Sequence, residues 1–359
     1  MKALVLAGGT GLRLRPFSHS RPKQLVPVAN KPILHYGLES IAVAGITDVG
    51  MIVNARSDAI RESAGDGSAF NIKLTYISQE APLGLAHCVL LARDFLGDDD
   101  FVMYLADNVV PGGISAVVAD FQRERPDALL AVGAVADPRQ YGVAEVDAAG
   151  RVLSVIEKAP TPRSRLAITG VYVFSDSVHR AVASIEPSDR DELEITHAIQ
   201  WLVEQGADVR AHVLAGAWKD TGKVGDLLDC NRLVLGTLAP DVRGKCDQET
   251  EIVGPVVLAE GAELIRSRVI GPTVIGAGSV VSDCYVGPYT SIGDDCLVEG
   301  SGIEYSVVLN GASVRSLPYL RDSVIGERAR VCAASSPGNA ARLVIGDDCE
   351  VAVRSCGSS

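Results

Sequence analysis

The chain has 359 residues, is 47% hydrophobic and 22% charged, and carries a formal net charge of −12. This composition excludes a disordered chain, a collagen-like chain and a disulfide-rich miniature domain, and the length predicts about two domains. The negative charge argues against nucleic acid or an anionic membrane surface as the main partner, although one local basic pocket is enough to bind a phosphate. The sequence has no run of about 18 apolar residues, so we expect no segment to span a membrane.

The eight cysteines include no Cys-x-x-Cys pair, so neither a zinc ribbon nor a redox pair is indicated. We interpret them as reduced, small apolar side chains of a cytoplasmic protein. The first apolar run is too short for the core of a signal peptide and predicts a buried strand instead.

Residues 1–240 alternate short apolar runs with helical patterns, which predicts an α/β domain built on a mostly parallel, Rossmann-like sheet. The expected strands are 2–7, 49–53, 74–77, 101–106 and 129–135. The expected helices are 32–44, 192–204 and 223–238. Pro240 marks the predicted boundary of this domain.

Beyond residue 240 the helical periodicity disappears and one aliphatic residue recurs every six positions, as in Val286, Ile292 and Val298. This period predicts a parallel β-helix over 241–359, in which each step forms one flat side of a triangular coil. Glycine, asparagine or aspartate is expected at the corners, often at positive φ. The pattern indicates architecture and says nothing about chemistry.

A glycine-rich turn follows the first predicted strand and contains Gly8, Gly9 and Gly11. It lacks the Lys-Ser/Thr ending of a Walker A loop and does not match the dinucleotide fingerprint. Such a turn lets successive backbone N–H groups point at one anion. Because Arg13 and Lys23 follow closely, we predict a triphosphate cradle; the alternative is a plain structural turn.

Two aspartates are candidate metal ligands. Asp107 ends an apolar strand, which would place its carboxylate at the carboxyl edge of the sheet, where ligands bind in open α/β folds. A helix-capping or turn aspartate is the alternative for Asp107 taken alone. A second carboxylate, Asp220, follows Trp218, and together the two aspartates predict a Mg²⁺ site.

Eight motifs in sequence order resemble those of the sugar-1-phosphate nucleotidyltransferases. They are the glycine run with Arg13, Lys23-Gln-Leu-Val-Pro27, Asp107-Asn108, Tyr141-Gly142, Glu157-Lys158, Thr169-Gly170, Glu192-Leu-Glu-Ile-Thr196 and Trp218-x-Asp220-Thr-Gly222. The motifs cover residues 1–240, and the repeats cover most of the rest. The chain is most similar to the long form of the family, in which a left-handed β-helix follows the catalytic domain.

The resemblance implies a role for each matching residue. The nucleotide would be bound by Leu6, Gly8, Gly9, Gly11, Gln79, Gly84, Leu85 and Asp107. The sugar phosphate would be bound by Asn108, Tyr141, Gly142, Glu157, Lys158, Thr169, Gly170, Tyr172 and Trp218. Arg13 and Lys23 would be catalytic, acting on the departing pyrophosphate and the reacting phosphates. Asp107 and Asp220 would hold Mg²⁺.

The segment that begins at Lys23 is more similar to the thymidylyl-transferring members than to the uridylyl-transferring ones. The resemblance therefore implies dTTP and glucose 1-phosphate as substrates and dTDP-glucose as product, the first step of dTDP-deoxysugar biosynthesis. UTP or another nucleotide remains an alternative. The sequence departs from the usual pattern at Ala106 and His197, where glycine and aspartate are usual. His87 is interpreted as a helix histidine rather than a catalyst.

Two other functions agree less well with the sequence. Parallel β-helices of this period often belong to acyltransferases, but those enzymes generally need a histidine base, and no histidine lies beyond His212. A non-catalytic regulatory subunit is disfavoured because Arg13, Lys23, Asp107 and Asp220 are all present. Residues 241–359 are instead expected to support stability and assembly into a homo-oligomer.

Overall fold

The computed structural model describes residues 1–9, 11–18, 21–54, 57–334 and 343–354. Contacts between residues divide the chain into two compact units. The first, here called the sheet unit, comprises Met1–Thr10 and Ile33–Asp220; the second, the coil unit, comprises Gly11–Pro32 and Thr221–Ser359. This division differs from a single boundary after residue 240, because an early segment and the helix α8 (Val224–Leu235) group with the C-terminal repeats.

The sheet unit is built on nine strands, in the order β10-β9-β11-β6-β1-β4-β5, with β8 paired to β11 and to β12. Their bounds are β1 (Lys2–Leu6), β4 (Asp48–Val53), β5 (Lys73–Ser78), β6 (Phe101–Leu105), β8 (Ala128–Ala134), β9 (Gly142–Val146), β10 (Val152–Glu157), β11 (Leu166–Phe174) and β12 (Val209–Val213). The pairs β1–β4, β1–β6 and β4–β5 are parallel, which confirms the predicted Rossmann-like core. The strands β9, β10 and β11 pair antiparallel and were not predicted.

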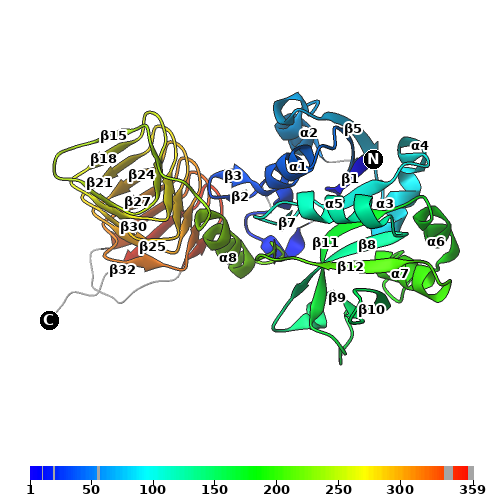
Figure 1. Ribbon diagram of the computed structural model, residues 1–359. Helices are drawn as coiled ribbons and strands as arrows, with labels where there is room; N and C mark the ends of the chain where they lie inside the picture. The colour runs from blue at the N-terminus through cyan, green and yellow to red at the C-terminus, as the bar shows by residue number, and fades with distance from the viewer. Residues whose placement is uncertain (10, 19–20, 55–56, 335–342, 355–359) are drawn as a thin grey trace. The chain divides into compact units, whose positions relative to one another are not determined.

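Helices cover both faces of this sheet (Figure 1). Their bounds are α1 (Ile33–Val43), α2 (Asp58–Ala64), α3 (Leu85–Leu91), α4 (Arg93–Leu96), α5 (Ser115–Glu124), α6 (Val178–Ser184) and α7 (Ile195–Glu204), and the 3-10 turns of this unit are η3 (Ser68–Phe70) and η4 (Pro138–Gln140). The helices α3, α6 and α7 share one core cluster with Leu4 and Met103. Met103 faces that cluster on one side of the sheet. The next residue, Tyr104, faces the other side and contacts Gly37 of α1, so the sheet is buried on both faces.

The predicted helices were correct at 32–44 and 223–238, within the usual fraying of helix ends. The third begins at Ile195 rather than at residue 192, because Glu194 is its N-cap residue with extended backbone angles. None of the helices in the described part of the chain is long and apolar enough to cross a membrane.

The coil unit is a parallel β-helix whose three sides are parallel sheets, consistent with the predicted left-handed β-helix. The first side comprises β14 (Asp241–Val242), β17 (Val256–Leu258), β20 (Thr273–Ile275), β23 (Thr290–Ile292), β26 (Val307–Val308), β29 (Val324–Ile325) and β31 (Val344–Ile345). The second comprises β15 (Lys245–Cys246), β18 (Glu263–Ile265), β21 (Val280–Ser282), β24 (Leu297–Glu299), β27 (Ser313–Arg315), β30 (Arg330–Ala334) and β32 (Glu350–Arg354). The third comprises β16 (Glu251–Val253), β19 (Arg268–Ile270), β22 (Tyr285–Val286), β25 (Gly302–Glu304) and β28 (Leu320–Arg321).

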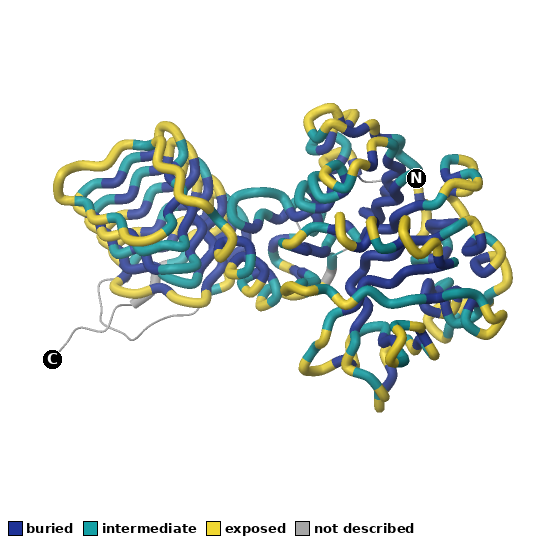
Figure 2. The backbone as a smooth tube through the Cα atoms, in the orientation of Figure 1, coloured by how far each residue is buried: buried dark blue, intermediate teal, exposed yellow. Residues whose placement is uncertain are grey.

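The predicted aliphatic ladder forms the core of this β-helix. Ile275, Val286, Ile292 and Val298 are fully buried in a single apolar cluster. Figure 2 shows the buried residues as dark blue stretches on the strands, with exposed residues at the corners. Each side repeats in register, so that Val256 pairs with Thr273 and the chain stacks coil on coil.

The corners differ in part from the expectation of glycine, asparagine and aspartate. Asp283 and Asp295 have positive φ as expected, but so do Arg266, Tyr289 and Tyr305. Such angles are uncommon for bulky residues. The stacked coils hold these corners in place; the Tyr305 amide, for example, donates to the carbonyl of Pro288.

Buried serines link neighbouring coils across the narrow interior. The Ser279 hydroxyl donates to the carbonyl of Gly293 at 2.7 Å and accepts from the amide of Cys296 at 2.8 Å. The Ser301 hydroxyl donates within its own coil to the Glu299 carbonyl and accepts from the amide of Leu317 on the next coil. These hydroxyls satisfy backbone groups that would otherwise be buried without partners.

Replacing Ser279 with alanine should therefore lower the free energy of unfolding by about 1–3 kcal/mol, because two buried backbone groups lose a partner. The change is measured by denaturant unfolding followed by circular dichroism. Ser316→Ala, at an exposed corner, is the control and should change stability little. Equal stability of the two variants would contradict the role assigned to Ser279.

Candidate active site

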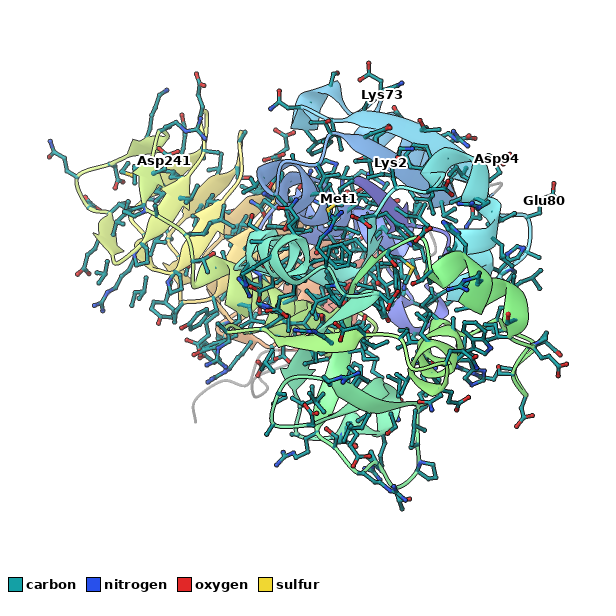
Figure 3. The ribbon with its side chains drawn as sticks, turned by 45° about the vertical axis from the view of Figure 1, so that its right-hand side comes forward. Met1, Lys2, Lys73, Glu80, Asp94 and Asp241 are labelled. Carbon is teal, nitrogen blue, oxygen red and sulfur yellow. The ribbon has the colours of Figure 1, made fainter. Side chains whose placement is uncertain are left out.

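The sheet unit contains a cavity of about 250 Å³. Its lining includes all nine residues predicted to bind the sugar phosphate: Asn108, Tyr141, Gly142, Glu157, Lys158, Thr169, Gly170, Tyr172 and Trp218. Asp220 and Leu85 also line it. Charged side chains elsewhere on this unit, such as Lys73, Glu80 and Asp94, point outward (Figure 3). The structure thus brings residues from six of the eight motifs into one cavity.

A break in β11 shapes one wall of the cavity. The pairing of β11 with β8 shifts between Ile168 and Tyr172. Gly170 lies in this break at φ +77°, and a Cβ there would lie 2.7 Å from Nδ2 of Asn108. Glycine is therefore required for the close approach of β11 to Asn108.

A short strand pair relates the backbones of the two predicted metal ligands. Asp107 lies in the turn after β6, directly before β7 (Asn108–Val109). The strand β13 (Lys219–Asp220) pairs antiparallel with β7, so that Asp220 lies opposite Asn108. The backbone of Asp220 is therefore one position away from that of Asp107 across this strand pair.

Asn108 links this strand pair to the carboxylate of Asp107. Its Nδ2 donates to Oδ1 of Asp107 at 3.0 Å, and its Oδ1 accepts from Nε1 of Trp218 at 2.7 Å. The Tyr104 hydroxyl donates to the backbone carbonyl of Asn108 at 2.9 Å. Since Asn108 is 3% exposed, its amide orientation is fixed by these partners, and with it the orientation of Asp107.

The donor set fits a magnesium ion. Asp107 and Asp220 offer hard carboxylate oxygens, and the described residues contain no group of three or more His, Cys, Asp or Glu side chains arranged to hold a metal. Two protein carboxylates suit Mg²⁺, which commonly keeps several waters and substrate phosphate oxygens as its other ligands.

A charged network forms another wall of the cavity. Glu157 pairs with Lys158 at 3.0 Å and with Arg190 at 3.2 Å, and Arg190 also pairs with Glu194 at 2.6 Å. Burial lowers the pKa of Arg190, but the carboxylates of Glu194 and Glu157 outweigh that effect and raise it above its usual value. Arg190 therefore remains a cation in the cavity.

Two hydroxyl-bearing residues of the cavity are held as neutral groups. The Thr169 hydroxyl donates to the carbonyl of Ala131 at 3.0 Å, which leaves its oxygen as an acceptor. Tyr172 is fully buried, and burial together with the nearby charge of Glu157 raises the pKa of its phenol. Neither group can act as a base at neutral pH.

Three of the predicted nucleotide-binding residues, Leu6, Gly8 and Asp107, lie at the carboxyl ends of β1 and β6. Leu6 pairs with Leu105, and the Ala106 amide donates to the carbonyl of Leu6 at 3.1 Å. Because β1 and β6 are neighbouring parallel strands, Gly8 and Asp107 follow them at the same edge of the sheet. Ala106 is buried there, so the methyl group that replaces the usual glycine is accommodated.

Gln79 is fixed beside the glycine turn. Its Nε2 lies 3.5 Å from the carbonyl oxygen of Gly84 and 3.2 Å from Nδ1 of His87. Its Oε1 lies 3.2 Å from the position that a Cβ of Gly8 would occupy. His87, interpreted from sequence as a helix histidine, therefore contacts Gln79, which is predicted to bind the nucleotide.

Two further glycines are required by their surroundings. Gly84 has φ +100°, and a Cβ there would lie 2.4 Å from the Leu193 carbonyl oxygen. Gly11, in the coil unit, has φ +66°, and a Cβ there would lie 2.9 Å from Cβ of Lys23. Gly11 can lie this close to Lys23 only because it has no Cβ.

The predicted catalytic cations lie in the coil unit rather than the sheet unit. Arg13 is exposed in the 3-10 turn η1 (Leu12–Leu14), and Lys23 opens η2 (Lys23–Leu25). His197, the other departure from the usual pattern, is exposed on α7 and is not among the residues that line the cavity.

Comparison with known proteins identifies the family. A family model described as "Nucleotidyl transferase" matches residues 2–236. The chain is 54% identical to a "Glucose-1-phosphate thymidylyltransferase" of Streptomyces griseus, over 97% of this chain and 98% of the relative. The chain belongs to the nucleotidyl transferase family. It is also 50% identical to a "Glucose-1-phosphate thymidylyltransferase" of Streptomyces antibioticus, over 99% of this chain and 100% of that relative.

A solved structure supports the same assignment. A putative glucose-1-phosphate thymidylyltransferase from Bacillus anthracis, in complex with a sucrose, is 31% identical to this chain, with a TM-score of 0.62. The matched region covers 65% of this chain and 95% of the chain in that structure. These findings confirm the resemblance to nucleotidyltransferases and the predicted fold class. The individual roles of the site residues stay predictions.

Several residues of this nucleotidyl transferase site were not predicted from the sequence. Arg190, Gln140, Glu192 and Glu194 line the cavity beside the predicted residues. Glu192 and Glu194 lie inside one of the eight motifs, and Arg190 lies just before it. The position of Arg190 next to an acidic motif was the one feature of the sequence that could have indicated its place in the cavity.

The variant Trp218→Phe should lower nucleotidyl transfer by roughly tenfold, because the loss of one buried hydrogen bond frees the Asn108 amide that orients Asp107. The rate is measured over a series of Mg²⁺ concentrations. The other tryptophan of the chain, Trp201 on α7, provides the control variant Trp201→Phe. Equal rates for the two variants would contradict the proposed link between Trp218 and Asp107.

Proposed function

We propose that the chain transfers the thymidylyl group of dTTP to glucose 1-phosphate, giving dTDP-glucose and pyrophosphate. The observation that supports this proposal most directly is the cavity lined by Asp220, Glu157, Lys158 and Arg190, together with the β7–β13 pair that sets Asp220 opposite Asn108, the residue after Asp107. The names of the two Streptomyces relatives support the choice of substrates.

The cavity has the chemistry that a sugar phosphate requires. Glu157 and Glu194 can accept hydrogen bonds from sugar hydroxyls, and Lys158 and Arg190 can bind the phosphate as cations. In the structure these groups pair with one another, and the neighbouring carboxylates raise the pKa of Arg190, which stays charged.

The reaction needs positioning and charge neutralisation rather than a general base. An oxygen of glucose 1-phosphate attacks the α-phosphorus of dTTP in line, and the bond to the β-phosphate breaks to release pyrophosphate. A phosphate monoester has a second pKa of about 6, so the nucleophile is already anionic at pH 7. Arg13 and Lys23 are assigned to the leaving pyrophosphate and the reacting phosphates. Mg²⁺ held by Asp107 and Asp220 would neutralise charge on the phosphate oxygens.

The orientation of Gln79 supports a pyrimidine with an N3–H group. Both hydrogens of its amide nitrogen are directed at acceptors, the Gly84 carbonyl and Nδ1 of His87. The carbonyl oxygen of Gln79 is then left to accept a hydrogen bond. Thymine and uracil carry a donor at N3 and cytosine does not, so this contact favours dTTP or UTP over CTP. UTP remains the alternative nucleotide.

We further infer a homo-oligomeric protein of a reducing, cytoplasmic compartment. The seven described cysteines are all free thiols. Burial raises the pKa of Cys88 to about 12 and that of Cys284 and Cys296 to about 11, so these three thiols are unreactive. The flat sides of the β-helix offer the surface through which subunits would assemble.

The substrates are tested by a pyrophosphate-release assay that crosses dTTP, UTP, CTP, ATP and GTP with several sugar 1-phosphates. We expect the highest kcat/KM for dTTP with glucose 1-phosphate, and CTP should be rejected. A preference for UTP would replace the thymidylyl assignment with its alternative. Absence of pyrophosphate release from every pair would overturn the proposed function.

The variant Asp107→Asn should lose about 10²-fold or more in kcat, because it removes one carboxylate charge from the proposed Mg²⁺ site without changing side-chain volume. Steady-state rates are measured as a function of Mg²⁺, with circular dichroism to verify the fold. Asp94→Asn, on the exposed helix α4, is the control and should keep full activity. Near-normal Mg²⁺-dependent rates for Asp107→Asn would exclude Asp107 as a metal ligand.

A further inference from the structure

The segment that carries both predicted catalytic cations is part of the β-helix unit. Gly11–Pro32 contains Arg13 and Lys23 and forms the short hairpin of β2 (Pro27–Val28) and β3 (Lys31–Pro32). Within the coil unit, β2 contacts α8, and α8 contacts β23 of the first side of the β-helix. Figure 1 shows β2, β3 and α8 beside the coils.

Arg21 connects this segment to the end of the β-helix that is last in the sequence. Its guanidinium lies 2.7 Å from a carboxylate oxygen of Glu327 and 3.1 Å from one of Asp347. The side chains of Arg21 and Asp347 are only 15% and 5% exposed. Burial lowers the pKa of Arg21, but the two carboxylates outweigh burial and raise it, so the group stays charged.

The two carboxylates belong to successive coils that are themselves joined. Oδ1 of Asp347 accepts from the amide of Glu327 at 2.8 Å, while Oδ2 of Asp347 accepts from Arg21. Close by, a Cβ on Gly346 would lie 3.0 Å from Cβ of Pro16. The segment therefore contacts the backbone of these coils as well as their charged side chains.

A second set of contacts holds the segment beyond Lys23. Nδ2 of Asn30 donates to the carbonyl of Ile292 at 2.6 Å. The amide of Ala29 donates to Oδ1 of Asn231 at 2.8 Å, and that oxygen also accepts from the Ser291 hydroxyl at 3.0 Å. Ala29 and Asn30 have φ of 46° and 63°, a conformation that the β-helix contacts help to maintain.

We infer that the β-helix fixes the backbone that carries Arg13 and Lys23, by holding it at Arg21 on one side of Lys23 and at Asn30 on the other. Arg21 is then a positioning residue for nucleotidyl transfer. The inference rests on the proposed function and extends it, because residues 241–359 then contribute to turnover as well as to stability and assembly.

A purely structural role for Arg21 makes a different prediction. Removing one partner of a mostly buried ion pair destabilises a protein whatever the function of the segment. A positioning role requires in addition that turnover falls in enzyme that is still folded, since a displacement of about 1 Å in a catalytic group can cost 10²-fold in rate.

The test compares Arg21→Ala with Arg328→Ala in the full chain. Arg328 pairs with Asp348 and Glu327 on the same coils, but its side chain is 59% exposed, which makes it a matched control. Both variants are assayed at a temperature below the melting temperature of each. We expect Arg21→Ala to lower kcat roughly 10- to 100-fold under these conditions. KM for glucose 1-phosphate should stay within about threefold, because the residues of the cavity in the sheet unit are untouched.

Two further variants distinguish an effect on the position of the catalytic cations from an effect on folding. Asp347→Asn keeps an oxygen to accept from the Glu327 amide while removing the charge opposite Arg21, so kcat should fall in a chain that still folds. Arg21→Lys keeps the positive charge and should recover part of the kcat that Arg21→Ala loses. Equal kcat for Arg21→Ala, Asp347→Asn and Arg328→Ala would overturn the inference. An inactive wild-type chain would instead contradict the proposed function.

Discussion

The whole site depends on a backbone pairing of two residues, that of Asn108 with Asp220 between β7 and β13. So short a ladder is not stable alone. It is held by the Trp218 indole, which donates to the Asn108 side chain, and by the Tyr104 hydroxyl, which donates to its backbone. The same contacts orient Asp107, because the side-chain amide nitrogen of Asn108 donates a hydrogen bond to the Asp107 carboxylate. Two residues far apart in the sequence, Asp107 and Asp220, thus have backbones one position apart across the ladder, as the proposed pair of metal ligands requires.

The cavity next to this pair is polar, and Glu157, Lys158, Arg190 and Glu194 are already paired with one another. Glu157 contacts Lys158, Arg190 and the hydroxyl of Thr196, so its carboxylate is held from three sides. Groups that are already oriented need little reorganisation when charge develops during the reaction. In the β-helix, too, buried polar groups have partners, since buried serines form hydrogen bonds with backbone groups of neighbouring coils.

Much of the fold was predictable because periodicity reports burial. The alternation of apolar runs located β1, β4, β5, β6 and β8, and the six-residue period located the β-helix core. Periodicity does not report which strands pair, so the antiparallel β9–β11 part was missed. The motifs identified the cavity residues, but not the contact of His87 with Gln79 or the attachment of Arg21 to Glu327. Those contacts join residues whose proximity is created by the fold, and no local pattern encodes them.

The proposed function requires Asp107 and Asp220 to hold one divalent cation together, next to the sugar-phosphate cavity. The most direct measurement is an anomalous difference map from crystals of the chain grown with Mn²⁺, a non-hydrolysable dTTP analogue and glucose 1-phosphate. Our account predicts a manganese peak within about 2–2.5 Å of a carboxylate oxygen of each aspartate, with phosphate oxygens among its other ligands. A metal bound without either aspartate, or nucleotide bound in turnover-competent crystals with both carboxylates directed away from its phosphates, would contradict it.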